Sequence, residues 1–302
     1  MDSSEITTLA GKALNRRKFL KGTGMAGLGI ASATLVGGSL NSLIAQNSIA
    51  PNKIALNGGH RSPTTVHDTP TDIFTAALIA EDLATTFYYN GLVGPVIMDP
   101  NLAGPGGSPH NLNPTDSNPG NVAYLQAAFT EEIDHADLMR SLLGLGSSQQ
   151  DPYQTFYFPS GTFDTLGPFL ALLDALENAF IGAYLTAVQE FAVLAVNGAA
   201  GYTSDQLEYF AKVAASIGCV EAEHRVLGRV IGNLNPANQK AYEQTDGLTS
   251  LANGPNSAED ALAPFLNPAT GPAYSLQQAL ANQGSVIYST PIQDVLPAST
   301  LY

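Results

Sequence analysis

The chain has 302 residues, long enough for one sizeable domain or two small ones, and its formal net charge is −14. An acidic surface of this kind repels nucleic acid and anionic membranes, so neither class of partner is expected. The single cysteine, Cys219, excludes an intramolecular disulfide, and its place in an apolar helical pattern predicts a small core residue.

The first 45 residues resemble a twin-arginine export signal. Arg16 and Arg17 precede a Phe-Leu pair, and residues 22–51 form an uncharged run rich in Gly and Ala. The resemblance implies cleavage near residue 45, a periplasmic or extracellular mature protein and no membrane insertion after cleavage. The alternative is an uncleaved membrane anchor, because the run is long enough to span a bilayer. Removal of residues 1–45 leaves 24 acidic and seven basic side chains, a net charge of −17.

A linker is predicted over residues 46–70, and the first of four helices over residues 71–92. A threonine and a proline immediately before this helix supply an N-cap and a first-turn proline. Along the inward stripe of the helix, Glu81 interrupts side chains that are otherwise uncharged. Residues 93–119 are predicted to be a long surface loop, because Gly, Pro and Asn are frequent and no hydrophobic period is present.

The second helix is predicted over residues 121–143. Glu132 and His135 occupy its apolar stripe, where side chains recur at steps of three and four. The alternative, an exposed Glu–His pair, is disfavoured because both residues follow the buried period. Three further acidic residues fall off the stripe and are predicted to form a solvated acidic face: Glu131, Asp134 and Asp137.

The third helix is predicted over residues 165–196, after a second long connection. Most of this helix is apolar on all sides, which predicts burial against several neighbours. A charged residue inside such a helix needs a partner. Glu177 lies on the shared stripe, and Glu190 is the competing carboxylate, nearly four turns further along.

The fourth helix is predicted over residues 204–231, with Glu221 and His224 on its inward seam. Residues 233–302 are rich in Asn, Ala, Pro, Ser and Gly and carry few charges. They predict an irregular C-terminal extension with one short helix over residues 275–283, packed on the bundle or on a neighbouring subunit. No chemistry is visible in this extension.

Two of the predicted helices carry a Glu-x-x-His unit, Glu132 to His135 and Glu221 to His224. Residues three apart share one helix face, so the carboxylate and the imidazole of each unit point at the same spot. Two such helices, with one inward Glu from each of two others, form the six-ligand di-iron or di-manganese site of a four-helix bundle. The predicted ligands are Glu81, Glu132, His135, Glu177, Glu221 and His224.

The order Glu, Glu-x-x-His, Glu, Glu-x-x-His resembles the ferritin-like superfamily, and in particular exported bacterial ferritin-like domain proteins, which are similar to desiccation-related proteins. The resemblance implies an all-α, ferritin-like four-helix bundle over residues 71–232. It further implies two Fe or two Mn ions bridged by Glu132 and Glu221. Glu81 and His135 would complete the coordination of one metal, and Glu177 and His224 that of the other. Two tyrosines lie close to this level, where core filling is favoured over hydrogen bonding to the ligands: Tyr88 and Tyr184.

Three functions fit this pattern, and the sequence does not decide whether the protein is an enzyme. The first is a redox enzyme that reduces dioxygen or peroxide by two electrons. The second is metal binding or storage in a cage assembly, against which the long loops and the C-terminal extension argue. The third is a non-catalytic envelope or stress-protection protein that keeps the bundle for stability. The pattern names no substrate and no catalytic residue, and a homo-oligomer is left open.

Overall fold

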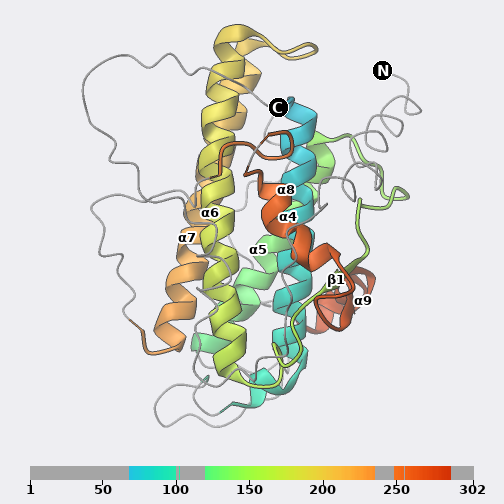
Figure 1. Ribbon diagram of the computed structural model, residues 1–302, viewed down its shortest axis with the longest axis vertical. Helices are drawn as coiled ribbons and strands as arrows, with labels where there is room; N and C mark the ends of the chain where they lie inside the picture. The colour runs from blue at the N-terminus through green and yellow to red at the C-terminus, as the bar shows by residue number, and fades with distance from the viewer. Residues whose placement is uncertain (1–67, 100–101, 103–119, 235–247, 255, 287–302) are drawn as a thin grey trace.

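A computed structural model describes the residues that form the fold (Figure 1). The described ranges are 68–99, 102, 120–234, 248–254 and 256–286. The predicted export signal over residues 1–45 lies outside the described residues, as do most of the predicted linker and most of the loop over residues 93–119.

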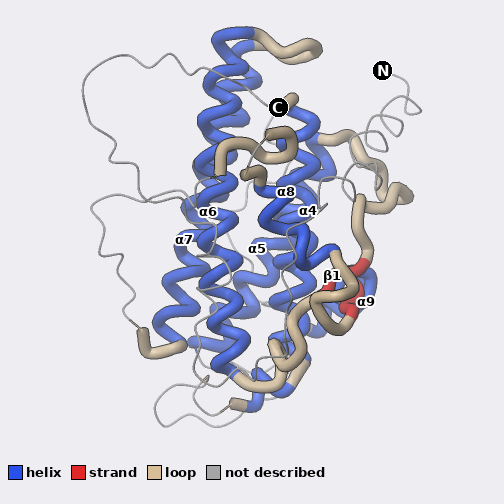
Figure 2. Tube along the Cα trace, viewed as in Figure 1, coloured by secondary structure: helices blue, strands red, loops and turns tan. Residues whose placement is uncertain are grey.

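Four long helices form a bundle, as the sequence predicts (Figures 1 and 2). Every helix end lies within one residue of its predicted position, and the all-α class is confirmed. Helices α4 and α5 pack against each other as one pair, and α6 and α7 as another. The bounds are α4 Pro70–Val93, α5 Gly120–Leu142, α6 Leu166–Asn197 and α7 Ser204–Ile231.

Local signals fix where two of these helices begin. Thr69 accepts a hydrogen bond from the backbone N–H of Asp72, and the Asp72 carboxylate accepts one from the backbone of Thr69, which is a capping box. Thr203 and Gln206 form the same motif at the start of α7. Both motifs satisfy N–H groups that a helix leaves unpaired at its first turn.

The apolar core of the bundle is divided into two clusters. One contains Leu83 and Phe129 and lies toward the end of the bundle where Phe87 stacks on Phe169. The other contains Leu78 and Phe191. The predicted ligands lie at the level between the two clusters. Water is therefore kept from this polar layer by apolar packing on both sides.

Among the described helices, α6 is the one long and apolar enough to cross a bilayer by length and composition. In this structure 56% of its most apolar window is buried within the protein. A central helix of a bundle meets the same criterion, because it is covered by neighbouring helices on several sides.

The C-terminal extension is more regular than the sequence indicates. Strand β2 (Ala273–Ser275) pairs antiparallel with β1 (Thr155–Tyr157). The predicted short helix is confirmed as α9 (Leu276–Asn282), whose Leu276 and Ala279 are fully buried against the bundle. The remaining short elements are the α-helix α8 (Ala258–Leu262) and the 3₁₀ helices η1 (Pro95–Met98), η2 (Ala263–Leu266) and η3 (Gln283–Ser285).

A buried aspartate ties this extension to the bundle. The Asp68 side chain accepts hydrogen bonds from the backbone N–H groups of Leu251, Ala252 and Asn253, at 2.6, 3.2 and 2.6 Å. The extension thus packs on the bundle of its own chain, one of the two arrangements predicted.

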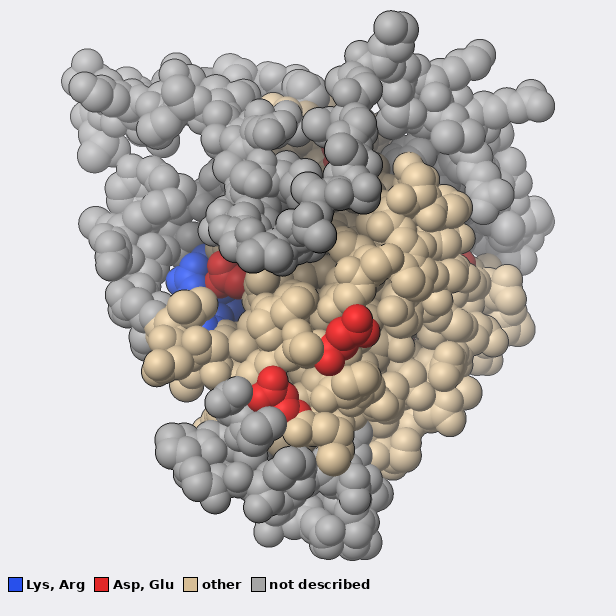
Figure 3. Space-filling view, turned by 60° about the horizontal axis from the view of Figure 1, so that its bottom comes forward, with Lys and Arg blue, Asp and Glu red and all other residues tan. Residues whose placement is uncertain are grey.

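The prediction of a buried Cys219 is wrong, because its side chain is exposed. Ile217 and Glu221 face the inside of the bundle. Cys219 lies two residues from each of them, which is about 200° around the helix, so its side chain points outward. Figure 3 shows a face on which Asp and Glu side chains stand apart rather than forming one acidic patch.

Candidate metal centre

The six predicted ligands converge from the four long helices onto one buried point. Their ligand atoms form two groups, and within each group all atoms lie within 4.8 Å of one another. Glu132 and Glu221 belong to both groups and are fully buried. Glu81 and His135 complete the first group, and the second adds Glu177 and His224.

In the first group, Nδ1 of His135 faces three carboxylates. It lies 3.4 Å from Oε2 of Glu81, 3.5 Å from Oε1 of Glu221 and 3.7 Å from Oε2 of Glu132. In the second group, Nδ1 of His224 lies 3.0 Å from Oε1 of Glu132 and 3.3 Å from Oε2 of Glu221. Oε1 of Glu177 lies 4.0 Å from the same nitrogen.

The two shared glutamates divide their oxygens between the groups. Glu132 turns Oε2 to His135 and Oε1 to His224, and Glu221 turns Oε1 to His135 and Oε2 to His224. A carboxylate in this orientation can give one oxygen to each of two cations. The arrangement therefore matches the bridging role that the resemblance implies for both residues.

Most ligand atoms of the centre lack a hydrogen-bond partner. Within the described residues, both carboxylate oxygens of Glu132 and of Glu221, and Nδ1 of each histidine, are buried without a hydrogen bond. Leaving charged groups unpaired in a low-dielectric interior is costly, so a buried group of this kind usually coordinates a cation or takes up a proton. Four carboxylates and two neutral imidazoles balance the charge of two divalent cations and are ligands that suit Fe and Mn.

Mutual repulsion and burial shift the titration of these groups. Burial raises the pKa of Glu81 and of Glu177 well above the usual range, and the Glu221 carboxylate raises it further. Burial by itself would lower the pKa of both histidines, but the surrounding carboxylates outweigh it and raise the pKa well above 6.5. Burial by itself would raise the pKa of Glu132, but the two imidazoles close to its carboxylate outweigh burial and hold the pKa below its usual value. Without metal, protons therefore occupy the centre.

A family model described as a ferritin-like domain matches residues 69–231, more than half of the chain and all four long helices. The chain belongs to the ferritin-like domain family. Comparison with curated proteins found no match, and comparison with solved structures found none either. The predicted superfamily is thus confirmed, and the ligand groups within this ferritin-like domain make metal binding plausible.

Two tyrosines of the ferritin-like domain reach across between α4 and α6. The hydroxyl of Tyr88 donates a hydrogen bond to Oε1 of Glu177 at 2.6 Å, and the hydroxyl of Tyr184 donates one to Oε1 of Glu81. Core filling alone, favoured from the sequence, is therefore wrong: both rings are buried and both hydroxyls hold a carboxylate. Each tyrosine follows a glutamate of its own helix by seven residues. Since the two helices run antiparallel at this level, each reaches the other helix's glutamate.

Glu131 was predicted to lie on a solvated acidic face, and this prediction is wrong. Its side chain is 28% exposed, and its Oε2 lies 2.7 Å from Nε2 of His224. A carboxylate at this nitrogen favours the imidazole tautomer with hydrogen on Nε2, which leaves the Nδ1 lone pair directed at the centre. Val220 stands at the equivalent position of the second Glu-x-x-His unit. The support for the two histidines is therefore unequal.

The other acidic residues near these motifs lie apart from the ligand groups. Asp134 is half-buried and Glu223 is exposed, and neither joins a ligand group. Glu190, the competitor of Glu177, is buried elsewhere, where its Oε2 accepts a hydrogen bond from the backbone N–H of Asp68. The preference for Glu177 over Glu190 as a candidate ligand agrees with this placement.

Proposed function

We propose that the ferritin-like domain holds a dinuclear iron or manganese centre. Glu132 and Glu221 would be shared between the two ions, Glu81 and His135 would complete the ligands of one ion, and Glu177 and His224 those of the other. The observation that carries this proposal is the division of carboxylate oxygens, because each shared glutamate turns one oxygen to each imidazole. A purely structural ion-pair cluster has no need of two such carboxylates in matched orientations.

We further propose that the centre carries out two-electron chemistry with dioxygen or hydrogen peroxide. Two iron or manganese ions supply this chemistry when bound, because each changes its oxidation state by one electron. The chain positions the ligands and excludes water. Tyr88 and Tyr184 fix the orientation of Glu177 and Glu81 through hydrogen bonds, and the two apolar clusters enclose the polar layer.

Elemental analysis of protein purified from its native compartment tests the metal proposal. We expect about two iron or manganese ions per chain, because structural and catalytic ligand sets of this size bind metal tightly. The loaded protein should then consume hydrogen peroxide or dioxygen, and Glu177→Ala should abolish that consumption. Glu223→Ala, which removes an exposed carboxylate of α7, is the matched control and should retain both metal and turnover.

Several outcomes would contradict parts of this proposal. Less than roughly one transition-metal ion per ten chains would exclude a tightly bound dinuclear centre. Zinc as the sole metal would exclude the redox function, because zinc has no accessible second oxidation state. A protein replete in iron or manganese that consumes neither oxidant would favour the alternative function, a non-catalytic envelope or stress-protection protein.

We also propose export by the twin-arginine route, on the basis of the N-terminal sequence alone. Replacing Arg16 and Arg17 with lysine should leave the precursor in the cytoplasm, because paired guanidinium groups are the feature of this signal. Cell fractionation followed by immunoblotting measures the outcome. Normal appearance of the mature form outside the inner membrane would contradict this route.

A further inference from the structure

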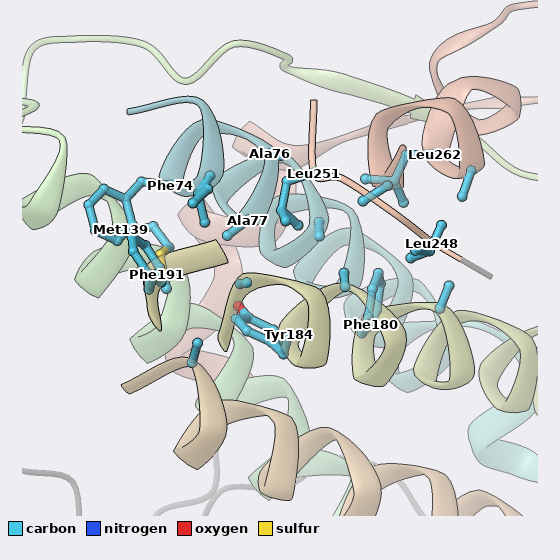
Figure 4. A pocket seen from close by; sticks show the side chains of 18 of the residues that line it. Phe74, Ala76, Ala77, Met139, Phe180, Tyr184, Phe191, Leu248, Leu251 and Leu262 are labelled. Carbon is cyan, nitrogen blue, oxygen red and sulfur yellow. The ribbon is translucent and has the colours of Figure 1, made fainter. Parts of the chain in front are cut away.

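An apolar cavity lies beside the candidate metal centre, between α4 and α6 (Figure 4). Its volume is about 30 Å³. Alanines of both helices supply much of the lining, and small side chains in these positions leave the space open. Phenylalanines and five residues of the C-terminal extension line the rest: Leu248, Leu251, Ala258, Ala261 and Leu262. The cavity is thus formed jointly by the bundle and the C-terminal extension.

The lining offers almost nothing to a polar molecule. All of its side chains are hydrocarbon except Met139, with a thioether, and Tyr184, with a hydroxyl. The Tyr184 proton is already donated to Glu81. A buried water needs two to four polar partners, and apolar cavities without them stay dry. Hydrogen peroxide has two donor groups and is disfavoured for the same reason.

The size of the cavity restricts an apolar occupant further. Benzene occupies protein cavities of roughly 150 Å³, several times the volume found here. Hydrocarbon chains and aromatic rings are therefore too large. A diatomic gas or a single xenon atom is of the right size, and xenon is known to enter dry cavities of this chemical character.

One residue connects the cavity to the centre. Tyr184 lines the cavity with its ring (Figure 4). Its hydroxyl donates a hydrogen bond to Glu81, a candidate ligand of the His135 half. Ala80, the neighbour of Glu81 in sequence, also lines the cavity. The cavity therefore abuts the ligands of one half of the centre, across a single layer of side chains.

The part of the lining that the C-terminal extension supplies is held in place by a hydrogen bond to the bundle. Leu251, Ala258 and Leu262 are buried and line the cavity from the side of the extension. The backbone of Leu251 donates a hydrogen bond to Asp68, which precedes α4. Without this extension the groove between α4 and α6 would open to solvent at that point.

We propose that this cavity is a binding site for dioxygen, from which the gas reaches the Glu81 half of the centre. This proposal rests on the proposed function, because a gas site serves the centre only if the centre reacts with an oxidant. Of the two oxidants considered, it selects dioxygen over hydrogen peroxide. It also assigns the C-terminal extension a role, that of closing an apolar gas site.

Gas binding is tested on the metal-free protein, so that the result does not depend on the centre. We expect crystals pressurised with xenon to show one atom in the cavity of the natural protein. In solution, dissolved dioxygen should broaden the methyl signals of Ala77 and Ala187 more than those of alanines outside the cavity. Absence of both effects would overturn the proposal.

Filling the cavity provides the matched comparison. Ala183→Leu and, separately, Ala77→Met add volume to the lining and should remove xenon density. Ala192→Leu places the same added volume on the exposed side of α6 and should leave xenon bound. Two filling variants on different helices are used because overpacking a core sometimes destabilises it. Persistence of xenon in both folded variants would contradict the assignment of the site.

The reactivity test uses protein loaded with ferrous ions. Two ferrous ions each lose one electron, and dioxygen takes up these two electrons and two protons from solvent to give hydrogen peroxide. We expect Ala183→Leu to slow oxidation by dioxygen several-fold while oxidation by added peroxide and the metal content stay unchanged. Equal slowing with both oxidants, or none with dioxygen, would overturn the proposal. Failure to retain iron or manganese would instead contradict the proposed function, and the xenon result would still decide the gas site.

Discussion

Glu221→Gln should remove much of the stability of the metal-loaded protein while changing the stability of the metal-free protein far less. The substitution keeps the volume of the side chain and removes its charge. In the metal-loaded protein, the amide would keep one oxygen, now uncharged, and replace the other with an NH2 group that cannot act as a ligand, so the two halves of the centre would no longer share this carboxylate. A ligand stabilises the folded state by about 2.7 kcal/mol when its free concentration is a hundred times Kd and by about 4.1 kcal/mol when it is a thousand times Kd. Weaker metal binding raises Kd and therefore lowers this stabilisation.

Without metal, two effects of the substitution oppose each other. Glu221 repels the Glu81 and Glu177 carboxylates, since its charge raises the pKa of both. A neutral glutamine removes that repulsion, and it also removes the attraction to the two imidazoles whose pKa the carboxylate raises. The metal-free variant should therefore unfold at nearly the same temperature as the natural protein. Thermal unfolding followed by circular dichroism, before and after chelation and reloading, measures both effects.

Glu223→Gln is the control for this experiment. Glu223 lies two residues away on the same helix, is exposed and belongs to neither ligand group. The substitution should change the stability of neither form. Equal destabilisation of both forms by Glu221→Gln would show that Glu221 serves packing alone.

The four helices and the six converging residues were predictable because both follow from a single period. Apolar side chains recur along one face of each helix, and Glu81, Glu132, Glu177 and Glu221 replace members of that face. An ionisable residue in such a place requires a partner, and four of them at one level provide partners for each other and for metal. Cap residues then fixed the helix ends.

The reciprocal tyrosine contacts had a signal in the sequence that the helical period alone did not reveal. Glu81 and Tyr88 are seven residues apart, and Glu177 and Tyr184 are separated in the same way. The repeated spacing indicates two equivalent halves. Whether each hydroxyl reaches a carboxylate depends on how the halves pack, which is set by tertiary structure.

Glu131 was missed because a helical period places the Cβ atom and not the end of a long side chain. Its backbone lies at the flank of the inward stripe of α5. Its carboxylate nevertheless reaches Nε2 of His224 on α7, another helix of the bundle. The sequence predicts an irregular extension for a related reason, since the pairing of β1 with β2 joins residues more than a hundred positions apart and leaves no local period.

The metal-free protein should lose stability as the pH rises from about 5 to about 8, and the metal-loaded protein should not. In the folded state the pKa is raised above the ordinary value at Glu81, Glu177, His135 and His224. The folded protein therefore binds more protons than the unfolded chain. The stabilisation is complete below the unfolded pKa values, near 4.5 for glutamate and 6.5 for histidine, and is lost as the pH rises toward the raised values.

The slope of this loss is about 1.4 kcal/mol per pH unit for each additional proton bound by the folded state. Glu132 acts in the opposite sense, because its lowered pKa stabilises the fold above about 4.5 and that contribution is lost only at lower pH. It therefore does not offset the loss between about pH 5 and 8. Burial also raises the pKa of Asp82, and that of Glu259 to about 7, so part of the slope arises outside the centre.

The part of the slope that belongs to the centre is isolated by Glu81→Gln combined with Glu177→Gln. This double variant should flatten the pH dependence of the metal-free protein, measured as the unfolding free energy by urea denaturation at each pH. Bound metal should abolish the centre's part in the natural protein, because the metal requires deprotonated ligands and its binding strengthens as the pH rises. If the unfolding free energy of the metal-free protein stays constant or increases over this pH range, the folded protein does not bind more protons than the unfolded chain, and the prediction is wrong.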